Sequence, residues 1–184
     1  MKNIKYSFLI LLASFIVACG FHLRGSQDLS AVLPEVEIQG VNKHSELGRE
    51  LSRALAAAKV SVLDESPVVL KITRDNFSKR VLSLDSAGRA NQYELNYQLS
   101  FSLLKKITEN KKQSHIDIIP AQSITAKREY LFDANQVIAK ADEEARLNND
   151  MRQAAMLQLT RRLMFSLKSS SLKKKKAEQA NKVK

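Results

Sequence analysis

The side chains that most often carry chemistry are sparse in this sequence and form no catalytic pattern. The three histidines, His22, His44 and His115, are far apart and have no cysteine or paired carboxylates at the spacing of metal ligands. No nucleophile elbow, phosphate-binding glycine loop or dinucleotide fingerprint occurs among the five glycines. Glu143 and Glu144 fall on a predicted helix, where a solvated face is a commoner role than a catalytic pair. The sequence therefore predicts a protein that is not an enzyme and holds no metal or cofactor.

Basic residues remain as candidates for binding an anion. The formal net charge is +11, and several arginines and lysines fall near predicted strand ends or at the start of the last predicted helix. Such groups bind phosphate, arginine with two parallel hydrogen bonds. The alternative is scattered solubilising charge, which is the commoner role for any single basic residue. The candidates are Arg80, Arg89, Lys127, Arg128 and Lys140.

The only cysteine, Cys19, ends an apolar segment near the amino terminus. Lys2 and Lys5 precede an uncharged run from Tyr6 to Ala18, which is typical of a secretory signal peptide and is shorter than the roughly 20 residues of a membrane-spanning helix. A lone cysteine in an exported protein is a free thiol, an intermolecular bridge or a modified residue. The sequence predicts a signal peptide over residues 1–18.

The residues before the cysteine resemble the lipobox of bacterial lipoproteins. Ile16, Val17 and Ala18 place a branched apolar residue three positions before the cysteine and a small one directly before it. The resemblance implies cleavage before Cys19, which then carries N-acyl and S-diacylglycerol groups, and two or more acyl chains anchor a protein stably. Gly20 is similar to the pattern that permits transfer to the outer membrane. An ordinary signal peptide that contains a cysteine is the alternative.

The last residues, 169–184, differ in composition from the rest of the chain. They carry a block of lysines without apolar periodicity, so the sequence predicts a disordered tail there and a single domain over residues 19–168. The tail is either a solvated segment or a binder of phosphorylated lipid. No nucleic-acid partner is expected, because an exported chain seldom meets nucleic acid and the sequence has no motif for it.

The first part of the domain predicts a strand, a helix and a second strand. Apolar and polar residues alternate over residues 35–41, and apolar residues recur at helical spacing over residues 45–59. Strand character returns over residues 60–63 and again over residues 68–73, which we count as one strand region. This order predicts a right-handed crossover that leaves the two strands parallel.

Two further strands are predicted after this unit. From Tyr93 to Leu103 the odd-numbered residues are apolar and the even-numbered ones are polar, so one face is buried and the other is wet. In the next strand, the apolar residues keep one even-numbered parity across an interruption at Pro120. These residues are Ile116, Ile118, Ile124, Tyr130 and Phe132.

The last predicted element is a long helix from Asn135 to Lys168, a stretch without glycine or proline. Its apolar residues recur at steps of three or four. They are Val137, Ala141, Ala145, Met151, Ala155, Leu159, Leu163 and Leu167. The expected fold class is α+β, a two-layer sandwich with two α-helices packed on one face of a four-stranded mixed sheet in the order β-α-β-β-β-α.

Three segments resemble the LptE family of lipopolysaccharide-assembly lipoproteins. They are CGFHLRG from Cys19 to Gly25, GRANQYELNYQLSF from Gly88 to Phe101, and REYLFDANQVIAK from Arg128 to Lys140. The element order and the polar tail also agree, and the resemblance covers residues 19–168.

This resemblance implies a partner and a ligand. Members of the LptE family sit as a plug in the lumen of the outer-membrane β-barrel LptD, assist its assembly and bind lipopolysaccharide on its way to the outer leaflet. It implies the same here, with acylated Cys19 held in outer-membrane lipid on the periplasmic side and the domain within the barrel lumen. A barrel lumen is polar, which suits a wet sheet face.

The resemblance also points to residues that contact lipopolysaccharide. Lys140 matches the family's basic position just after the turn that follows FD, Arg89 lies in the loop before the long strand, and Arg128 is a third candidate. The alternative function is a lipoprotein scaffold of another envelope machine, for barrel assembly or phospholipid transport. An envelope hydrolase is the least favoured function, because the sequence offers no assembled nucleophile or metal ligands.

Overall fold

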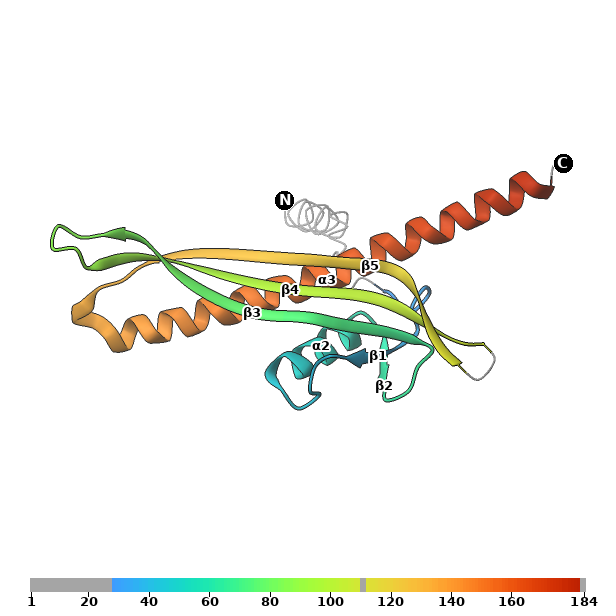
Figure 1. Ribbon diagram of the computed structural model, residues 1–184, viewed down its shortest axis with the longest axis horizontal. Coiled ribbons are helices and arrows are strands. Elements are labelled where there is room, and N and C mark those ends of the chain that lie inside the picture. Colours follow the sequence, from blue (N-terminus) through green and yellow to red (C-terminus); the bar gives the residue numbers. More distant parts are fainter. Residues whose placement is uncertain (1–27, 110–111, 183–184) are drawn as a thin grey trace, which may run out of the picture.

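The computed structural model describes residues 28–109 and 112–182, which form two helices and one five-stranded sheet (Figure 1). The helices are α2 (Glu46–Ala57) and α3 (Val137–Lys182), and a short 3-10 helix, η1 (Ala134–Gln136), precedes α3. The strands are β1 (Glu35–Gln39), β2 (Ser61–Leu63), β3 (Val68–Leu84), β4 (Ala90–Glu109) and β5 (Lys112–Leu131). Their order in the sheet is β2-β1-β3-β4-β5, and the α+β class with a mixed sheet is confirmed.

The sheet has five strands, so the prediction of four is wrong. Residues 60–63 and 68–73 do not form one strand, because β2 and β3 pair with opposite sides of β1. The break between β2 and β3 ends at Pro67, which has no N–H to donate to a neighbouring strand. The Pro67 carbonyl accepts a hydrogen bond from the Lys106 N–H. Both β2 and β3 run parallel to β1, as predicted for strands that flank a helical crossover.

Strands β3, β4 and β5 form a long antiparallel meander that extends well beyond α2 and β1 (Figure 1). The sequence predicts strand only to Thr73, since residues 74–84 show no regular alternation. Pairing with β4, from Arg74 opposite Ser100 to Leu84 opposite Ala90, extends β3 to Leu84. The ladder to a distant strand therefore decides this conformation where the local pattern does not.

The alternation predicted for β4 is confirmed. Its odd-numbered side chains from Leu95 to Leu103 are buried, and Tyr93 is half-buried. The even-numbered side chains are polar and form the open face of the sheet. Two of them, Glu94 and Ser102, are nevertheless buried by their neighbours on that face.

The single parity predicted for β5 fails before Pro120. The pairing changes from Phe101 opposite Gln122 to Leu103 opposite Ile119, and it shifts once more by Asp117, so β5 holds extra residues here. This irregular stretch buries Ile119, which has the wrong parity. Ile116 is 57% exposed, because the strand has passed beyond the helices at that point.

Helix α3 differs from its prediction at both ends. The buried stripe is confirmed from Met151 to Leu163, whereas Val137, Ala141 and Ala145 are exposed. At its other end α3 runs on to Lys182, through residues for which the sequence predicts disorder. The segment contains no glycine or proline to end the helix at Lys168.

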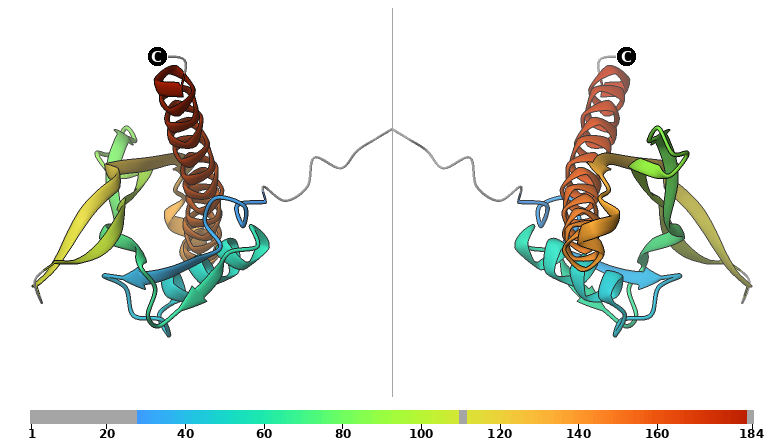
Figure 2. Two further views of the ribbon diagram at one scale, coloured as in Figure 1. Left: turned by 90° about the vertical axis from the view of Figure 1, so that its right-hand side faces the viewer. Right: turned by 90° about the vertical axis from the view of Figure 1, so that its left-hand side faces the viewer.

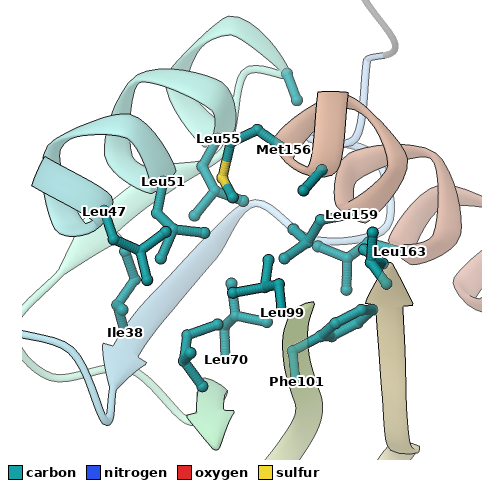
Figure 3. Close-up of a cluster of buried hydrophobic side chains, with 14 of the residues drawn as sticks. Ile38, Leu47, Leu51, Leu55, Leu70, Leu99, Phe101, Met156, Leu159 and Leu163 are labelled. Carbon is teal, nitrogen blue, oxygen red and sulfur yellow. The ribbon is translucent and has the colours of Figure 1, made fainter. Parts of the chain in front are cut away.

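The apolar core lies between α2, α3 and one half of the sheet (Figure 3). Leucines of both helices meet over the buried side chains of β1, β3 and β4, and burying one such side chain contributes about 1.5–3 kcal/mol. The labelled members are Ile38, Leu47, Leu51, Leu55, Leu70, Leu99, Phe101, Met156, Leu159 and Leu163. We call this the proximal end. The distal end comprises residues 79–94 of the β3–β4 hairpin and residues 127–147.

Within residues 28–109 and 112–182, neither helix has an apolar stretch long enough to span a membrane.

Candidate functional site

Arg89 lies in the turn that joins β3 to β4, and Asp85 builds this turn. The Asp85 carboxylate accepts hydrogen bonds from the backbone N–H groups of Arg89 and Ala87, both at 2.9 Å. The bond from Arg89 is the main reason why the pKa of Asp85 lies below its usual value. Gly88 has a φ of +77°, which glycine adopts without steric cost. The Arg89 Nε donates to Asp85 Oδ2 at 2.9 Å, yet its side chain is 72% exposed, so most of the guanidinium is open to solvent.

The turn from β5 into α3 lies at the same end of the sheet (Figure 1). The Phe132 N–H donates to the carbonyl of Asn91 at 2.8 Å, and the Phe132 ring packs edge-on against Tyr93. Asp133 then caps η1, since its Oδ1 accepts from the Asn135 N–H at 2.9 Å. These contacts determine where α3 begins relative to the sheet.

Lys140, in the first turn of α3, is already engaged by a carboxylate. Its Nζ lies 2.8 Å from Glu143 Oε2, and the Lys140 side chain is only 18% exposed. The Glu143 side chain is 44% exposed and can move away more easily. An anion that binds Lys140 must therefore share it with Glu143 or displace Glu143.

A polar and aromatic cluster, which we call the Lys79 cluster, joins the sheet to α3. Lys79 Nζ and the Tyr130 hydroxyl each lie 2.6 Å from the same oxygen, Glu144 Oε2. The Lys79 ammonium is also 4.1 Å from the centroid of the Tyr93 ring, within the range of a cation–π interaction. The fifth member, Phe132, packs on Tyr93 with centroids 5.5 Å apart. This cluster takes the place of an apolar core where α3 first crosses the sheet.

The charged form of the Lys79 cluster is the favoured one. Burial alone raises the pKa of Glu144, but the hydrogen bonds from Lys79 and Tyr130 outweigh it, and the pKa lies below its usual value. Burial likewise lowers the pKa of Lys79, and the bond to Glu144 more than reverses this. The expectation that Glu144 belongs to a solvated face is therefore wrong.

On the open face of the sheet, Glu94 lies between two cations. Arg80 Nε is 2.7 Å and Lys127 Nζ is 3.6 Å from Glu94 Oε1. The bond from Arg80 holds the pKa of Glu94 below its usual value against the effect of burial. With Ser78 and Asn96 these residues line a hollow of about 280 Å³. The two cations outnumber the single carboxylate, so the hollow favours an anion or a polar group.

Large apolar side chains surround the basic residues of the distal end. Ile138 is 82% exposed and Leu131 is 65% exposed. Exposed apolar groups that gather in this way mark contacts with a protein or a lipid. Val137 lies one helical turn before Lys140, and Leu84 directly precedes the Asp85 turn. The set consists of Val81, Leu82, Leu84, Leu131, Val137 and Ile138.

The structure brings the Arg89 turn and the helix start with Lys140 to one end of the sheet, and Arg128 lies farther from the tip of that end. Arg128 pairs with Leu95, six residues after Arg89, and its guanidinium donates to the Lys127 carbonyl at 2.8 Å. No hydrogen bond or ion pair within residues 28–109 and 112–182 joins any two of these three candidates. The sequence candidates therefore do not form one preassembled site.

Sequence reasoning missed the Lys79 cluster because residues 74–84 were not predicted as strand. Phe77 and Lys79 have the same parity, and Phe77 stacks on the buried Tyr97 with ring centroids 4.2 Å apart. That parity would have placed Lys79 on the face that the helices cover.

Other predicted sites lie elsewhere. Cys19 and His22 fall outside the described residues, so lipid attachment stays a prediction. His44 precedes α2, and His115 is exposed on β5. Within the described part of the chain, no three His, Cys, Asp or Glu side chains gather as metal ligands do.

The sequence matches a family of envelope lipoproteins. The family model described as "LptE: Lipopolysaccharide-assembly" matches residues 33–163. The protein named "LPS-assembly lipoprotein LptE" of Photorhabdus laumondii is 25% identical over 168 residues, which cover 89% of this chain and 87% of that protein. The protein of the same name from Pectobacterium atrosepticum is 24% identical over 169 residues, with the same coverage.

Solved structures share the fold. The solution NMR structure of an uncharacterized lipoprotein B from Nitrosomonas europaea has a TM-score of 0.62 at 28% identity and covers 84% of this chain and 96% of that chain. The crystal structure of rare lipoprotein B from Shewanella oneidensis has a TM-score of 0.56 at 24% identity, and the match covers 77% of this chain and 98% of that chain. The matched region of the family model includes every element of the distal end.

Proposed function

Since the chain belongs to the LptE family of lipopolysaccharide-assembly lipoproteins, we propose that it binds lipopolysaccharide and plugs an LptD-type outer-membrane barrel. In this proposal acylated Cys19 anchors the protein in the outer membrane from the periplasmic side. The domain lies within the barrel lumen and assists assembly of the barrel. In this proposal the protein acts by binding its ligand and its partner, in line with the prediction that it is not an enzyme.

One observation carries the lipopolysaccharide-binding part, namely cationic and apolar side chains side by side at the distal end. Lipopolysaccharide presents phosphates next to acyl chains, so a binding surface needs both kinds of group. Arg89 offers an exposed guanidinium that can bind phosphate bidentately. Val137 is exposed one helical turn before Lys140, which can exchange Glu143 for a phosphate.

Arg128 contributes least in this proposal. It lies opposite Leu95, six residues along the chain from Arg89, and its guanidinium already donates to the Lys127 carbonyl. We therefore expect its replacement to weaken binding less than replacement of Arg89 or Lys140.

The open face of β3, β4 and β5 supports the role as a plug. Its hydroxyl and amide side chains already bond to one another, for example Gln98 to Ser123 at 3.0 Å. A water-filled barrel interior is polar. A sheet face of this kind stays soluble without a covering layer and can still hydrogen-bond to a polar wall.

The ligand part is tested by capture of lipopolysaccharide with the full lipidated protein in detergent. Charge reversal by Arg89→Asp together with Lys140→Asp is expected to weaken capture at least several-fold, because each change removes a cation and adds a repelling charge. The matched control is Lys71→Asp with Lys105→Asp, two exposed lysines at the proximal end. Equal capture by both double variants would show that the distal charges are merely solubilising.

The partner part is tested by affinity purification from outer membranes. We expect an LptD-type barrel to co-purify, and depletion of the protein to reduce surface lipopolysaccharide first. Recovery of the protein alone, or simultaneous loss of many outer-membrane proteins on depletion, favours a scaffold of another envelope machine instead.

A further inference from the structure

The carboxy-terminal half of α3 carries an exposed stripe that the fold does not use. Leu157, Phe165 and Leu172 are 60%, 77% and 61% exposed. At about 100° per residue these three and the exposed Arg161 and Lys168 fall within an arc of about 80°, opposite the buried leucines of the helix. The stripe consists of Leu157, Arg161, Phe165, Lys168 and Leu172.

The charge of this half-helix has one sign. Every charged residue between Asp150 and Glu178 is basic. A helix that exposes an aromatic and two leucines among lysines and arginines fits the boundary between anionic lipid headgroups and acyl chains. Earlier at the same angles around α3, Glu143 and Asp150 are acidic and Leu147 packs partly against the core, so large exposed apolar side chains begin at Leu157.

The start of the described chain lies beside this part of α3. Leu29 is fully buried in the core cluster that contains Leu159 and Leu163, and its N–H donates to the Ala58 carbonyl at 2.9 Å. Figure 2 shows this first segment next to α3, on the side away from β4 and β5. The chain between Cys19 and Asp28 spans at most about 30 Å when fully extended. An anchor at Cys19 therefore keeps this part of α3 within reach of the membrane surface.

We propose that the stripe of α3 binds the anionic phospholipid surface of the leaflet in which Cys19 is anchored. Leu157, Phe165 and Leu172 enter the interface, while Arg161 and Lys168 pair with lipid phosphates. The inference rests on the proposed function in one respect, the acyl anchor at Cys19. The second contact sets the orientation of the long sheet relative to the membrane, which an acyl anchor alone does not.

The chain contains no tryptophan, so a single introduced tryptophan reports its own surroundings. We would incorporate the full lipidated Phe165→Trp protein in phosphatidylglycerol and phosphatidylethanolamine vesicles whose acyl chains carry bromine, a quencher. Strong quenching and a shift to shorter emission wavelength are expected. The matched control is Thr125→Trp, exposed on the open face of β5, and its emission is expected to stay unquenched.

A second reporter tests the residues of the stripe. The Leu157→Trp protein is expected to be quenched as well, and adding Phe165→Glu with Leu172→Glu is expected to reduce that quenching several-fold. Replacing phosphatidylglycerol in the vesicles by phosphatidylcholine is also expected to reduce the quenching. All three positions are exposed, so an unchanged melting temperature is expected to show that the fold is intact.

Three results would overturn the proposal in distinguishable ways. In one result, mass spectrometry shows that the Phe165→Trp protein is acylated, yet its emission is unquenched. This would refute lipid binding by the stripe and leave the proposed function intact, because these vesicles contain neither lipopolysaccharide nor a barrel. An unacylated Cys19 would refute this proposal and the membrane-anchor part of the proposed function. Shielding of the introduced tryptophan only when outer-membrane proteins are added would make the stripe a protein contact and the lipid assignment wrong.

Discussion

The two ends of this sheet hold the same helix by different physical means. At the proximal end α3 packs on α2 and the sheet through leucines that exclude water, such as Leu99, Leu159 and Leu163. At the distal end it is held by the Lys79 cluster, in which one carboxylate binds an ammonium and a phenol. Apolar burial scales with area, whereas a partly exposed ion pair contributes little net energy.

The difference indicates that the two ends of the sheet have different roles. The proximal end stabilises the fold, and the distal end is left free to expose basic and apolar side chains to a ligand. A cluster held by few polar contacts opens more easily than a packed core, as ligand-binding regions commonly do. This comparison is open to test by substitutions at each end.

The largest effect is expected in the proximal core. Leu99 is fully buried, so Leu99→Ala should lower the free energy of unfolding by about 2–5 kcal/mol through lost burial and a cavity. Leu131→Ala at the distal end removes the same atoms from a side chain that is 65% exposed, and should cost less than about 0.5 kcal/mol. Urea denaturation measures both. Equal losses would contradict the division between the two ends.

A smaller and local effect is expected for Lys79→Met. It leaves the half-buried Glu144 without its cation, at a cost of about 1–2 kcal/mol, kept low because the Lys79 side chain is 35% exposed. Hydrogen exchange should accelerate in the first turns of α3 and stay unchanged from Met151 onward. Uniform acceleration along α3 would mean that the cluster belongs to the global core.

The pH dependence should have opposite signs at the two ends. The pKa of Glu144 is lowered on folding, so its stabilisation is present above its usual value near 4.5 and is lost as the pH falls through the folded pKa. Burial between the helices raises the pKa of Glu50, although Arg152 opposes this, so folding favours its neutral form.

Isosteric variants measure these signs. From pH 7 to pH 3, Glu144→Gln should be less stable than the unsubstituted protein at pH 7 and approach it in acid. Glu50→Gln should be as stable or more stable at pH 7 and lose that advantage in acid. Thermal unfolding across this pH range gives both curves, and parallel curves would refute the assignment.

A small effect on stability is also expected for Arg89→Gln. The turn is built by Asp85 and the backbone, so loss of one exposed ion pair should cost less than about 1 kcal/mol. Circular dichroism on heating measures it. A larger loss would mean that Arg89 is structural, and its loss of lipopolysaccharide capture would then need another explanation.

The predictions from sequence succeed where one face of an element is wholly apolar. The alternation of β4 and the stripe of α3 from Met151 to Leu163 are both confirmed, because burial repeats with the period of the element. They fail for residues 74–84 and for the start of α3. There the side that joins α3 to the sheet carries Lys79 and Glu144, which a hydrophobic pattern counts as exposed.

For the candidate site, the resemblance to the LptE family indicates Arg89 and Lys140, and both lie at the distal end. The pairing of Lys140 with Glu143 is an i,i+3 contact within one helix, so it is local to the predicted helix. The place of Arg128 relative to these two residues depends on strand register, which only the folded sheet decides.

The amino-acid sequence by itself determined the α+β class, the long alternating strand, the two amphipathic helices and the family, since these follow from local periodicity and short motifs. Only the tertiary structure decided that the strand region over residues 60–73 divides around β1, that β3 continues to Leu84, and that Lys79 meets Glu144. The physical reason is that ladder bonds and a shared carboxylate form between distant segments, and their energy appears only once the chain has folded.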